Sequence, residues 1–159
     1  MTYPQWLPEL FNVHPWTDST YSDLYHIFVR DFIDSQPLYQ GQAIWFFPEV
    51  EDGKQVIFWH LTTRDDKLTG QRLPDLRRCE RLPWVRPILC DSPCPKILNW
   101  DYEEGDGTTK TYVWLKEHNF VVILKKYPNG SRRLITSFWV EYPHTKRRFI
   151  DKYNHRIGA

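Results

Sequence analysis

A series of strand-like segments joined by short turns fills residues 97–140, and it restricts the possible folds more than any other part of the chain. Residues 109–116 present two alternating sets of side chains, and residues 120–127 are rich in β-branched and aromatic types. The turns at 117–119 and 128–130 are so short that the strands on either side must be antiparallel neighbours. The sequence therefore predicts consecutive antiparallel strands, with these side chains in the core: Val113, Leu115, Val122, Leu124 and Ile135.

Helical patterns precede and follow these strands. Apolar residues recur at three- and four-residue spacing from Tyr21 to Phe32, which predicts a helix that begins near Thr17 and ends near Pro37. The remaining segments are a strand or buried loop at 43–47, a strand at 56–63, a basic helix at 74–81, an extended segment at 84–89 and a basic helix at 145–155. The predicted fold is one α+β domain over residues 1–159, in which N-terminal helices pack on a C-terminal antiparallel β-sheet of about four strands and a helix closes the chain.

Length and composition fit a single folded domain. With 159 residues, of which 16% are aromatic, the chain can bury a core and is not disordered. No apolar run approaches the roughly 20 residues of a membrane-spanning helix, and the first residues lack the features of a signal peptide. We therefore expect a cytoplasmic protein without membrane contact.

The three cysteines, Cys79, Cys90 and Cys94, are expected to be reduced thiols. A zinc site or a disulfide at the C-x3-C pair is the rarer alternative, so we expect no metal and no cofactor. The arginines around Cys79 would lower its pKa, but no partner base is evident that would make it a nucleophile.

Charge is distributed unevenly along the chain. Residues 1–59 hold two basic and eight acidic side chains, residues 60–90 hold seven basic and four acidic, and residues 143–159 hold five basic and one acidic. A surface polarised in this way is commonly a nucleic-acid interface, so RNA is an expected partner. Ordinary solvated helix faces would give the same pattern.

Residues 56–64 could bring several phosphate-binding side chains to one place. The apolar run that begins at Val56 ends at His60, Thr62 and Arg64. A histidine can accept or donate a proton near neutral pH, an arginine can bind two phosphate oxygens, and hydroxyls complete the cradle. His60 is therefore the candidate for proton transfer, and Thr62 and Arg64 are candidates for substrate binding. A structural histidine at a strand end is the alternative.

The predicted basic helix adds a cluster of arginines. Arg77 and Arg81 share a face at four-residue spacing, and Arg78 and Arg81 are neighbours at three-residue spacing. We expect Arg78 and Arg81 to be catalytic and Arg77 to bind substrate. The alternative is that these guanidinium groups only form ion pairs with Asp75 and Glu80.

The last strand and the final helix supply the other candidates. Thr136 and Ser137 point to opposite faces of a strand, so only one of them can reach a site; Thr136 is the catalytic candidate, Ser137 a substrate-binding one, and simple β-propensity is the alternative. Tyr142 and His144 are candidates for a second proton carrier, although a histidine there could equally be a surface residue. The basic side chains that we expect to bind substrate from the final helix are Lys146, Arg147 and Arg148.

Several runs resemble a family of bacteriophage-related proteins found in prophages and mobile elements: FWHLTTR, LPDLRRCERLPWVRPIL, the isolated Trp100, YVWLKEHNFVVILKK and LITSFWVEYPHTKRRFIDKY. The resemblance extends roughly from the first helix to residue 153. Its order of elements is similar to the barnase–EndoU–colicin–RelE-like (BECR) ribonuclease fold, in which toxins often end in a strand with Thr or Ser. This resemblance implies active-site roles for His60, Arg78, Arg81 and Thr136. Unlike barnase, the chain offers no clear catalytic Glu, so the general base stays open.

The expected function is a metal-independent endoribonuclease, a toxin or phage-defence effector of a mobile element that cuts RNA to a 2′,3′-cyclic phosphate. Its partners would be an RNA such as tRNA or mRNA and a neutralising antitoxin or immunity protein. One alternative is a non-catalytic RNA- or protein-binding module on the same fold. Another is an anti-defence or regulatory protein that acts through the acidic residues 1–59. Convergence of His60, an arginine from residues 77–81 and Thr136 in one cleft would favour the enzyme.

Overall fold

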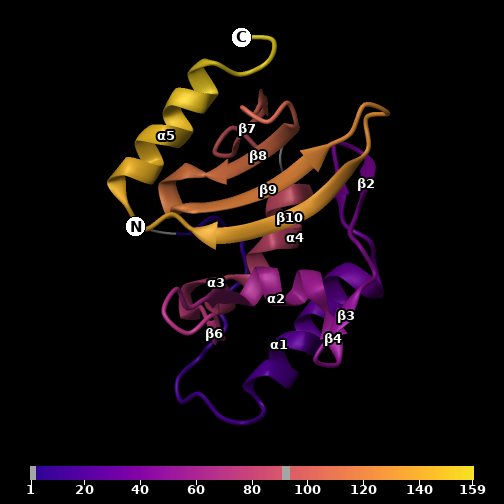
Figure 1. Cartoon of the computed structure of the whole chain (residues 1–159), viewed down its shortest axis with the longest axis vertical. Coiled ribbons are helices and arrows are strands. Elements are labelled where there is room, and N and C mark those ends of the chain that lie inside the picture. Colours follow the sequence, from indigo (N-terminus) through magenta and orange to yellow (C-terminus); the bar gives the residue numbers. More distant parts are fainter. Residues whose placement is uncertain (1–2, 91–93) are drawn as a thin grey trace.

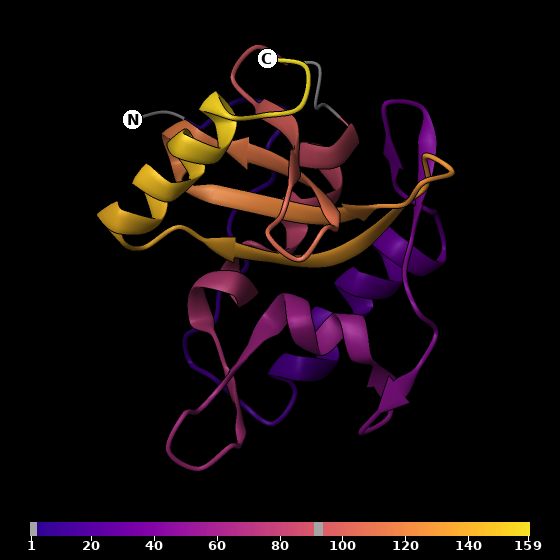
Figure 2. The same cartoon turned by 45° about the horizontal axis from the view of Figure 1, so that its top comes forward.

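The computed structural model of the protein describes residues 3–90 and 94–159. A curled six-stranded sheet lies at its centre, with the strand order β1-β2-β10-β9-β8-β7. The final helix, α5 (Pro143–Asn154), lies across one face of this sheet, and α1, α2 and α3 lie on the other side (Figure 1, Figure 2). The protein is therefore α+β, as the sequence predicts.

The predicted run of antiparallel strands is confirmed, but the whole sheet is larger and mixed. Consecutive antiparallel neighbours are β7 (Leu98–Glu103), β8 (Thr109–Leu115), β9 (Phe120–Lys126) and β10 (Arg132–Trp139). Two strands from the N-terminal half extend the sheet: β2 (Gln42–Trp45) runs parallel to β10, and β1 (Leu38–Tyr39) is antiparallel to β2. The expected antiparallel sheet of about four strands is thus a mixed sheet of six, because residues 42–45 pair with the outer edge of β10.

Each face of the sheet buries its own apolar cluster. Against the N-terminal helices, the predicted core residues are fully buried in four cases: Val113, Leu115, Val122 and Leu124. On the other face, Phe149 of α5 packs among aromatic side chains of β8 and β10. The fifth predicted core residue, Ile135, is only half-buried, because the pairing of β10 with β9 shifts between Leu134 and Thr136 and leaves Ile135 in a β-bulge.

The helices of the N-terminal half are short. They are α1 (Thr20–Phe28), continued by the π-helical turn η1 (Val29–Ile33), then α2 (Val56–Thr62), α3 (Leu76–Glu80), the 3-10 turn η2 (Leu82–Trp84) and α4 (Val85–Cys90). A further 3-10 turn, η3 (Lys116–His118), joins β8 to β9. The predicted helices near the N-terminus, in the basic segment and at the C-terminal end are confirmed. None of the helices in the described ranges is long and apolar enough to span a membrane.

Residues 56–62 form the helix α2, so the predicted strand is wrong. Ile57, Phe58 and Leu61 are buried in the core, whereas His60 is exposed, as on one turn of an amphipathic helix. A short apolar run fits a buried strand and a buried helix equally well when only its pattern is known. The predicted extended segment at 84–89 is likewise mostly helical, since α4 tolerates Pro87 in its first turn.

Two small hairpins lie at the ends of α2. Before it, β3 (Val50–Glu51) pairs with β4 (Lys54–Gln55) across a tight turn in which Asp52 and Gly53 have φ angles of 50° and 79°. After it, β5 (Thr63–Asp65) pairs with β6 (Arg72–Pro74). Polar side chains from both hairpins therefore reach the exposed side of α2.

Candidate functional site

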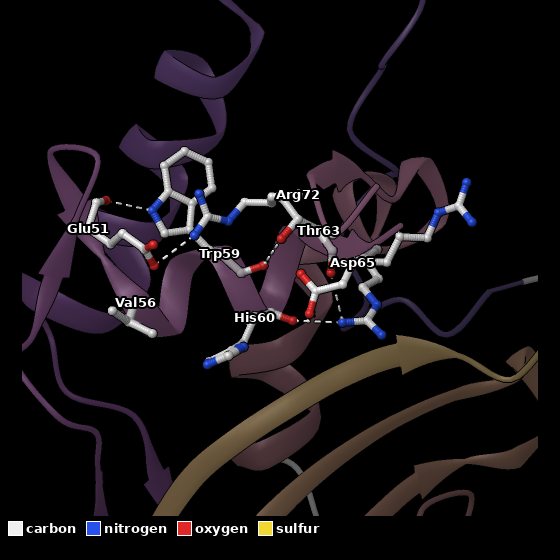
Figure 3. A pocket seen from close by; sticks show the side chains of 10 residues that line it. Glu51, Val56, Trp59, His60, Thr63, Asp65 and Arg72 are labelled. Atoms are coloured by element: carbon white, nitrogen blue, oxygen red, sulfur yellow. Dashed lines mark hydrogen bonds and ion pairs between the residues drawn. The ribbon is translucent and has the colours of Figure 1, made fainter. Parts of the chain in front are cut away.

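A polar pocket of about 570 Å³ opens beside α2. Figure 3 shows side chains from both hairpins and from α2 converging on it. Its lining consists of Glu51, Val56, Trp59, His60, Thr63, Arg64, Asp65, Gly70, Arg72 and Arg78. Residues from the five elements β3, α2, β5, β6 and α3 thus meet at one surface, and the candidates His60, Arg64 and Arg78 are among them.

Arg78 connects α3 to the end of α2 and to β10. Its Nη1 donates to the backbone carbonyl oxygens of His60 at 2.8 Å and Thr63 at 3.1 Å, and to Thr136 Oγ1 at 3.5 Å. The Thr136 hydroxyl in turn donates to the His60 carbonyl at 3.2 Å. A cation suits the carbonyl oxygens that remain unpaired at a helix C-terminus. His60, Arg78 and Thr136 therefore converge, although they contact one another through the backbone of His60.

The imidazole of His60 is free of these contacts. In Figure 3 it points away from Asp65 and toward the ribbon of β10. Partial burial, and then the positive charge of Arg78, lower the pKa of His60 below its usual value. The ring is therefore mostly neutral at pH 7, which is the form that can accept a proton.

A second, smaller pocket of about 300 Å³ lies on the other side of His60. It is lined by Phe46, Phe47, Glu49, Val56, Ile57, His60, Arg133, Leu134, Ile135 and Thr136. His60 and Val56 line both pockets and form the wall between them. The imidazole is consequently accessible from two sides.

The polar pocket also contains residues that the sequence analysis missed. Arg72 binds the carboxylates of Glu51 at 2.7 Å and Asp52 at 2.9 Å, and its guanidinium carbon lies 4.7 Å from the centre of the Trp59 ring. Asp65 is exposed, and its carboxylate makes no hydrogen bond or ion pair with the described residues. Asp65 lies opposite Arg72 in the register of the β5–β6 hairpin, and recognition of this hairpin would place both residues at one site.

Arg64 borders two pockets. Besides the polar pocket it lines a third one of about 670 Å³, together with Arg77 and Tyr142. The Arg64 side chain is exposed and makes no hydrogen bond or ion pair within the described part of the chain. Arg77, by contrast, pairs with Glu80 at 3.0 Å, which is the ion pair weighed for it from the sequence.

Three other candidates do not line the polar pocket. The Thr62 side chain is fully buried and donates to the Phe58 carbonyl at 2.9 Å, so it stabilises α2 and does not face a ligand. Arg81 is buried too, where it pairs with Glu80 at 3.1 Å. Ser137 is 1% exposed, and its hydroxyl has no partner among the described residues. Thr136 therefore reaches the site and Ser137 does not, in line with the expectation that only one of them could.

The candidates at the C-terminal end lie elsewhere. The rings of Tyr142 and His144 stack on each other with centroids 5.4 Å apart at the start of α5. Both side chains are exposed, and neither lines a pocket that contains His60. The remaining basic candidates, Lys146, Arg147 and Arg148, are carried by α5, which lies across the sheet from α2 (Figure 2).

The environment of Cys79 differs from the sequence expectation. Its thiol is buried and donates to the Thr62 carbonyl at 3.2 Å. Burial, helped by the charges of Asp75 and Glu80, raises the pKa of Cys79 to about 12, so the neighbouring arginines do not produce a reactive thiolate. Cys90 and Cys94 are free thiols on either side of residues 91–93, which lie outside the described part of the chain. Among the described residues, no three His, Cys, Asp or Glu side chains are grouped so that they could hold a metal ion.

The geometry thus joins His60, Arg64, Arg78 and Thr136 with Asp65 and Arg72 on one side of α2. The chain matches no protein-family model, no curated protein and no solved structure.

Proposed function

We propose that the protein is a metal-independent endoribonuclease and that the pocket beside α2 is its active site. The observation that carries the proposal is the position of the His60 imidazole between two pockets, next to the Arg78–Thr136 contact of 3.5 Å. A proton acceptor, a guanidinium and a hydroxyl beside an open cleft are the groups that cleavage by a 2′-hydroxyl needs.

In the proposed reaction, neutral His60 accepts the proton of the ribose 2′-hydroxyl. The 2′-oxygen then attacks the adjacent phosphorus, and the bond to the 5′-oxygen breaks, which leaves a 2′,3′-cyclic phosphate. The lowered pKa of His60 supports this role, since the ring is already deprotonated at neutral pH. His60 would thus be the general base that the sequence leaves unassigned.

Arg78 and Arg64 would stabilise the charge that develops on the phosphorane. Arg78 Nη1 is held by its contacts with His60, Thr63 and Thr136, and its Nε forms the ion pair with Asp75, at 3.3 Å, that the sequence offers as the alternative. Its Nη2 makes no hydrogen bond with the described residues. A guanidinium fixed in this way can bind phosphate without reorganising. Arg64 has no partner to lose, because its exposed side chain forms no ion pair within the described ranges.

The leaving 5′-oxygen needs a proton. Tyr142 and His144 line neither of the pockets beside His60, so we do not assign this step to them. Water in the open polar pocket, or the imidazolium of His60 itself, would supply the proton. Asp65, whose carboxylate faces the same pocket, would favour the imidazolium form of His60 after proton transfer.

A non-catalytic RNA-binding module is the second candidate. The contacts of Arg78 favour this candidate, because its guanidinium donates to the carbonyl oxygens of His60 and Thr63. An arginine with a purely structural role would make the same contacts. In that case the positive charges would hold RNA and His60 would have no chemical role. An endoribonuclease encoded on a mobile element would act as a toxin or defence effector and would require a neutralising partner; a binding module would not.

Single-turnover cleavage of a labelled RNA by wild type and by His60→Gln tests the proposal. His26→Gln is a matched control, because His26 is also an exposed histidine on a helix but lines none of the pockets described above. We expect His60→Gln to cut at least about a hundredfold more slowly, His26→Gln to cut normally, and the wild-type products to carry 2′,3′-cyclic phosphate ends in the presence of EDTA. Equal rates for wild type and His60→Gln, or loss of cleavage in EDTA, would refute the mechanism.

A further inference from the structure

The smaller pocket beside His60 has the character of a base-binding site. Its volume of about 300 Å³ is at the lower end of the range for small-ligand pockets. Phe46, Phe47 and Ile135 provide an apolar lining, and the Phe47 side chain is 47% exposed. The guanidinium carbon of Arg133 lies 4.4 Å from the centre of the Phe47 ring. The planar guanidinium of Arg133 therefore lies over the Phe47 ring, and the exposed part of that ring remains open at the pocket.

This pocket is continuous with the proposed catalytic groups. His60 and Val56 separate it from the polar pocket. Thr136, which lines the smaller pocket, contacts Arg78, which lines the polar pocket. A phosphate held at His60, Thr136 and Arg78 would have one pocket on each side. The nucleotides that flank a scissile phosphate would consequently extend in opposite directions from α2.

Polar groups are also available to the edge of a base. Glu49 offers carboxylate oxygens that can accept hydrogen bonds from an amino group, and Arg133 offers guanidinium N–H donors. The Nε of Arg133 already donates to the Tyr127 hydroxyl at 2.9 Å, which fixes its plane, and Arg133 forms no ion pair within the described residues. Apolar faces with a few polar groups at the edge are the usual means of binding an unstacked base.

We propose that the pocket formed by Phe46, Phe47, Glu49, Arg133 and Ile135 binds one unpaired base and thereby directs the site to single-stranded RNA. The inference rests on the proposed function for the class of ligand. A base within an A-form duplex is stacked on both faces and paired along its edge, so it cannot enter a pocket between side chains. A base in a loop or a single strand can enter and stack on Phe47.

Binding of a non-cleavable RNA tests this inference separately from catalysis. The probe is a fluorescently labelled 2′-O-methyl oligonucleotide of mixed sequence, which lacks the attacking hydroxyl, used as a single strand and as a duplex with its complement; anisotropy gives the dissociation constants. The variants are Phe47→Ala, Phe47→Trp and, as a control, Ile33→Ala. Ile33 is an apolar residue with nearly the same exposure, 46%, but it lines none of the pockets described above.

We expect wild type to bind the single strand more tightly than the duplex, and Phe47→Ala to weaken single-strand binding about tenfold, the scale of one base–aromatic stack. Phe47→Trp and Ile33→Ala should bind as wild type, and no variant should change duplex binding. Equal binding of single strand and duplex, or an unchanged constant for Phe47→Ala, would overturn the inference.

The two proposals fail in different ways. If wild type cleaves unmodified RNA but Phe47→Ala binds and cleaves normally, the base pocket is refuted and the ribonuclease proposal stands. If wild type binds the single strand in a Phe47-dependent way but never cleaves unmodified RNA, the base pocket stands and the catalytic proposal is refuted. If wild type binds neither form of the probe and does not cleave unmodified RNA, both are refuted.

Discussion

The guanidinium of Arg78 donates to the backbone carbonyl of His60 at 2.8 Å, across eighteen residues of sequence. This bond ties α3 to the last turn of α2, and the same Nη1 reaches Thr136 of β10. It places a positive charge beside the imidazole and so contributes to the lowered pKa of His60. Arg78 would thus have two roles, one in holding the site together and one in binding phosphate, and suitable substitutions can separate them.

Arg78→Lys should slow cleavage much more than it destabilises the protein. A lysine keeps the positive charge but cannot bind the His60 and Thr63 carbonyls and a phosphate at the same time. We expect a rate loss of roughly a hundredfold, as for a lost donor to a developing charge.

Arg78→Ala should also lower the free energy of unfolding, by about 1–3 kcal/mol, because it leaves carbonyl oxygens unpaired. Urea unfolding and single-turnover kinetics would measure both; an unchanged rate in Arg78→Lys would leave Arg78 with a structural role only.

Arg81→Ala is expected to act on stability alone. The Arg81 side chain is buried, pairs with Glu80, and lies with its guanidinium carbon 5.2 Å from the Trp84 ring and 5.7 Å from the Trp139 ring. Glu80 would keep its ion pair with Arg77, so the loss is that of one hydrogen bond to a charged group, about 1.5–3 kcal/mol. The melting temperature should fall, while the cleavage rate per folded molecule stays the same. A slower cleavage rate at a temperature where the variant is fully folded would indicate that Arg81 takes part in catalysis.

The rate of cleavage should rise with pH through a single inflection and then stay constant. A general base must be deprotonated, so kcat/KM should rise with pH up to the pKa of His60 and be constant above it. Because partial burial and Arg78 lower this pKa, the inflection should lie below the usual value of about 6.5. Arg78→Gln removes one of these causes, and its inflection should therefore move to higher pH. An inflection in wild type that lies above 6.5, or that does not move in Arg78→Gln, would assign the proton transfer to another group.

Arg64 and Arg147 should differ in the step that they affect. Arg64 lines the proposed active site, whereas Arg147 is exposed on α5, on the other side of the sheet. Arg64→Ala should lower the single-turnover rate even at saturating enzyme, with stability changed by less than about 0.5 kcal/mol. Arg147→Ala should reach the wild-type rate when the enzyme concentration is raised, with a reduced salt dependence if RNA extends that far. Rescue of both variants by concentration would show that Arg64 contributes to RNA binding and not to the chemical step.

The sequence predicts the strands of the C-terminal half because their signals are local. The Pro128-Asn129-Gly130 turn and the β-rich run before it fix β9 and β10 without knowledge of the rest of the chain. The parallel pairing of β2 with β10 joins residues 44 and 132, and neither segment has a sequence pattern that identifies the other as its partner strand. The pattern of residues 56–62 does not distinguish a helix from a strand, because the same apolar side chains suit a buried helix and a buried strand.

The candidate site was predictable by residue type more than by geometry. His60, Arg64, Arg78 and Thr136 do meet beside α2, as their chemistry suggests. Spacing on a short helix could not show that Arg78 turns toward α2 while Arg81 turns toward Trp84. Asp65 and Arg72 depend on the register of the β5–β6 hairpin, and Phe47 and Arg133 on the pairing of β2 with β10. These are tertiary relationships, which composition and periodicity do not contain.

The pairing of β2 with β10 also determines when the walls of the proposed site can come together during synthesis. The N-terminal helices are translated before β10 (Arg132–Trp139), the strand that supplies Thr136 and Arg133. Contacts between segments so far apart in sequence form slowly and only once both are present. A nascent chain that has not reached residue 139 therefore lacks one wall of the proposed site, which is complete only after translation of β10.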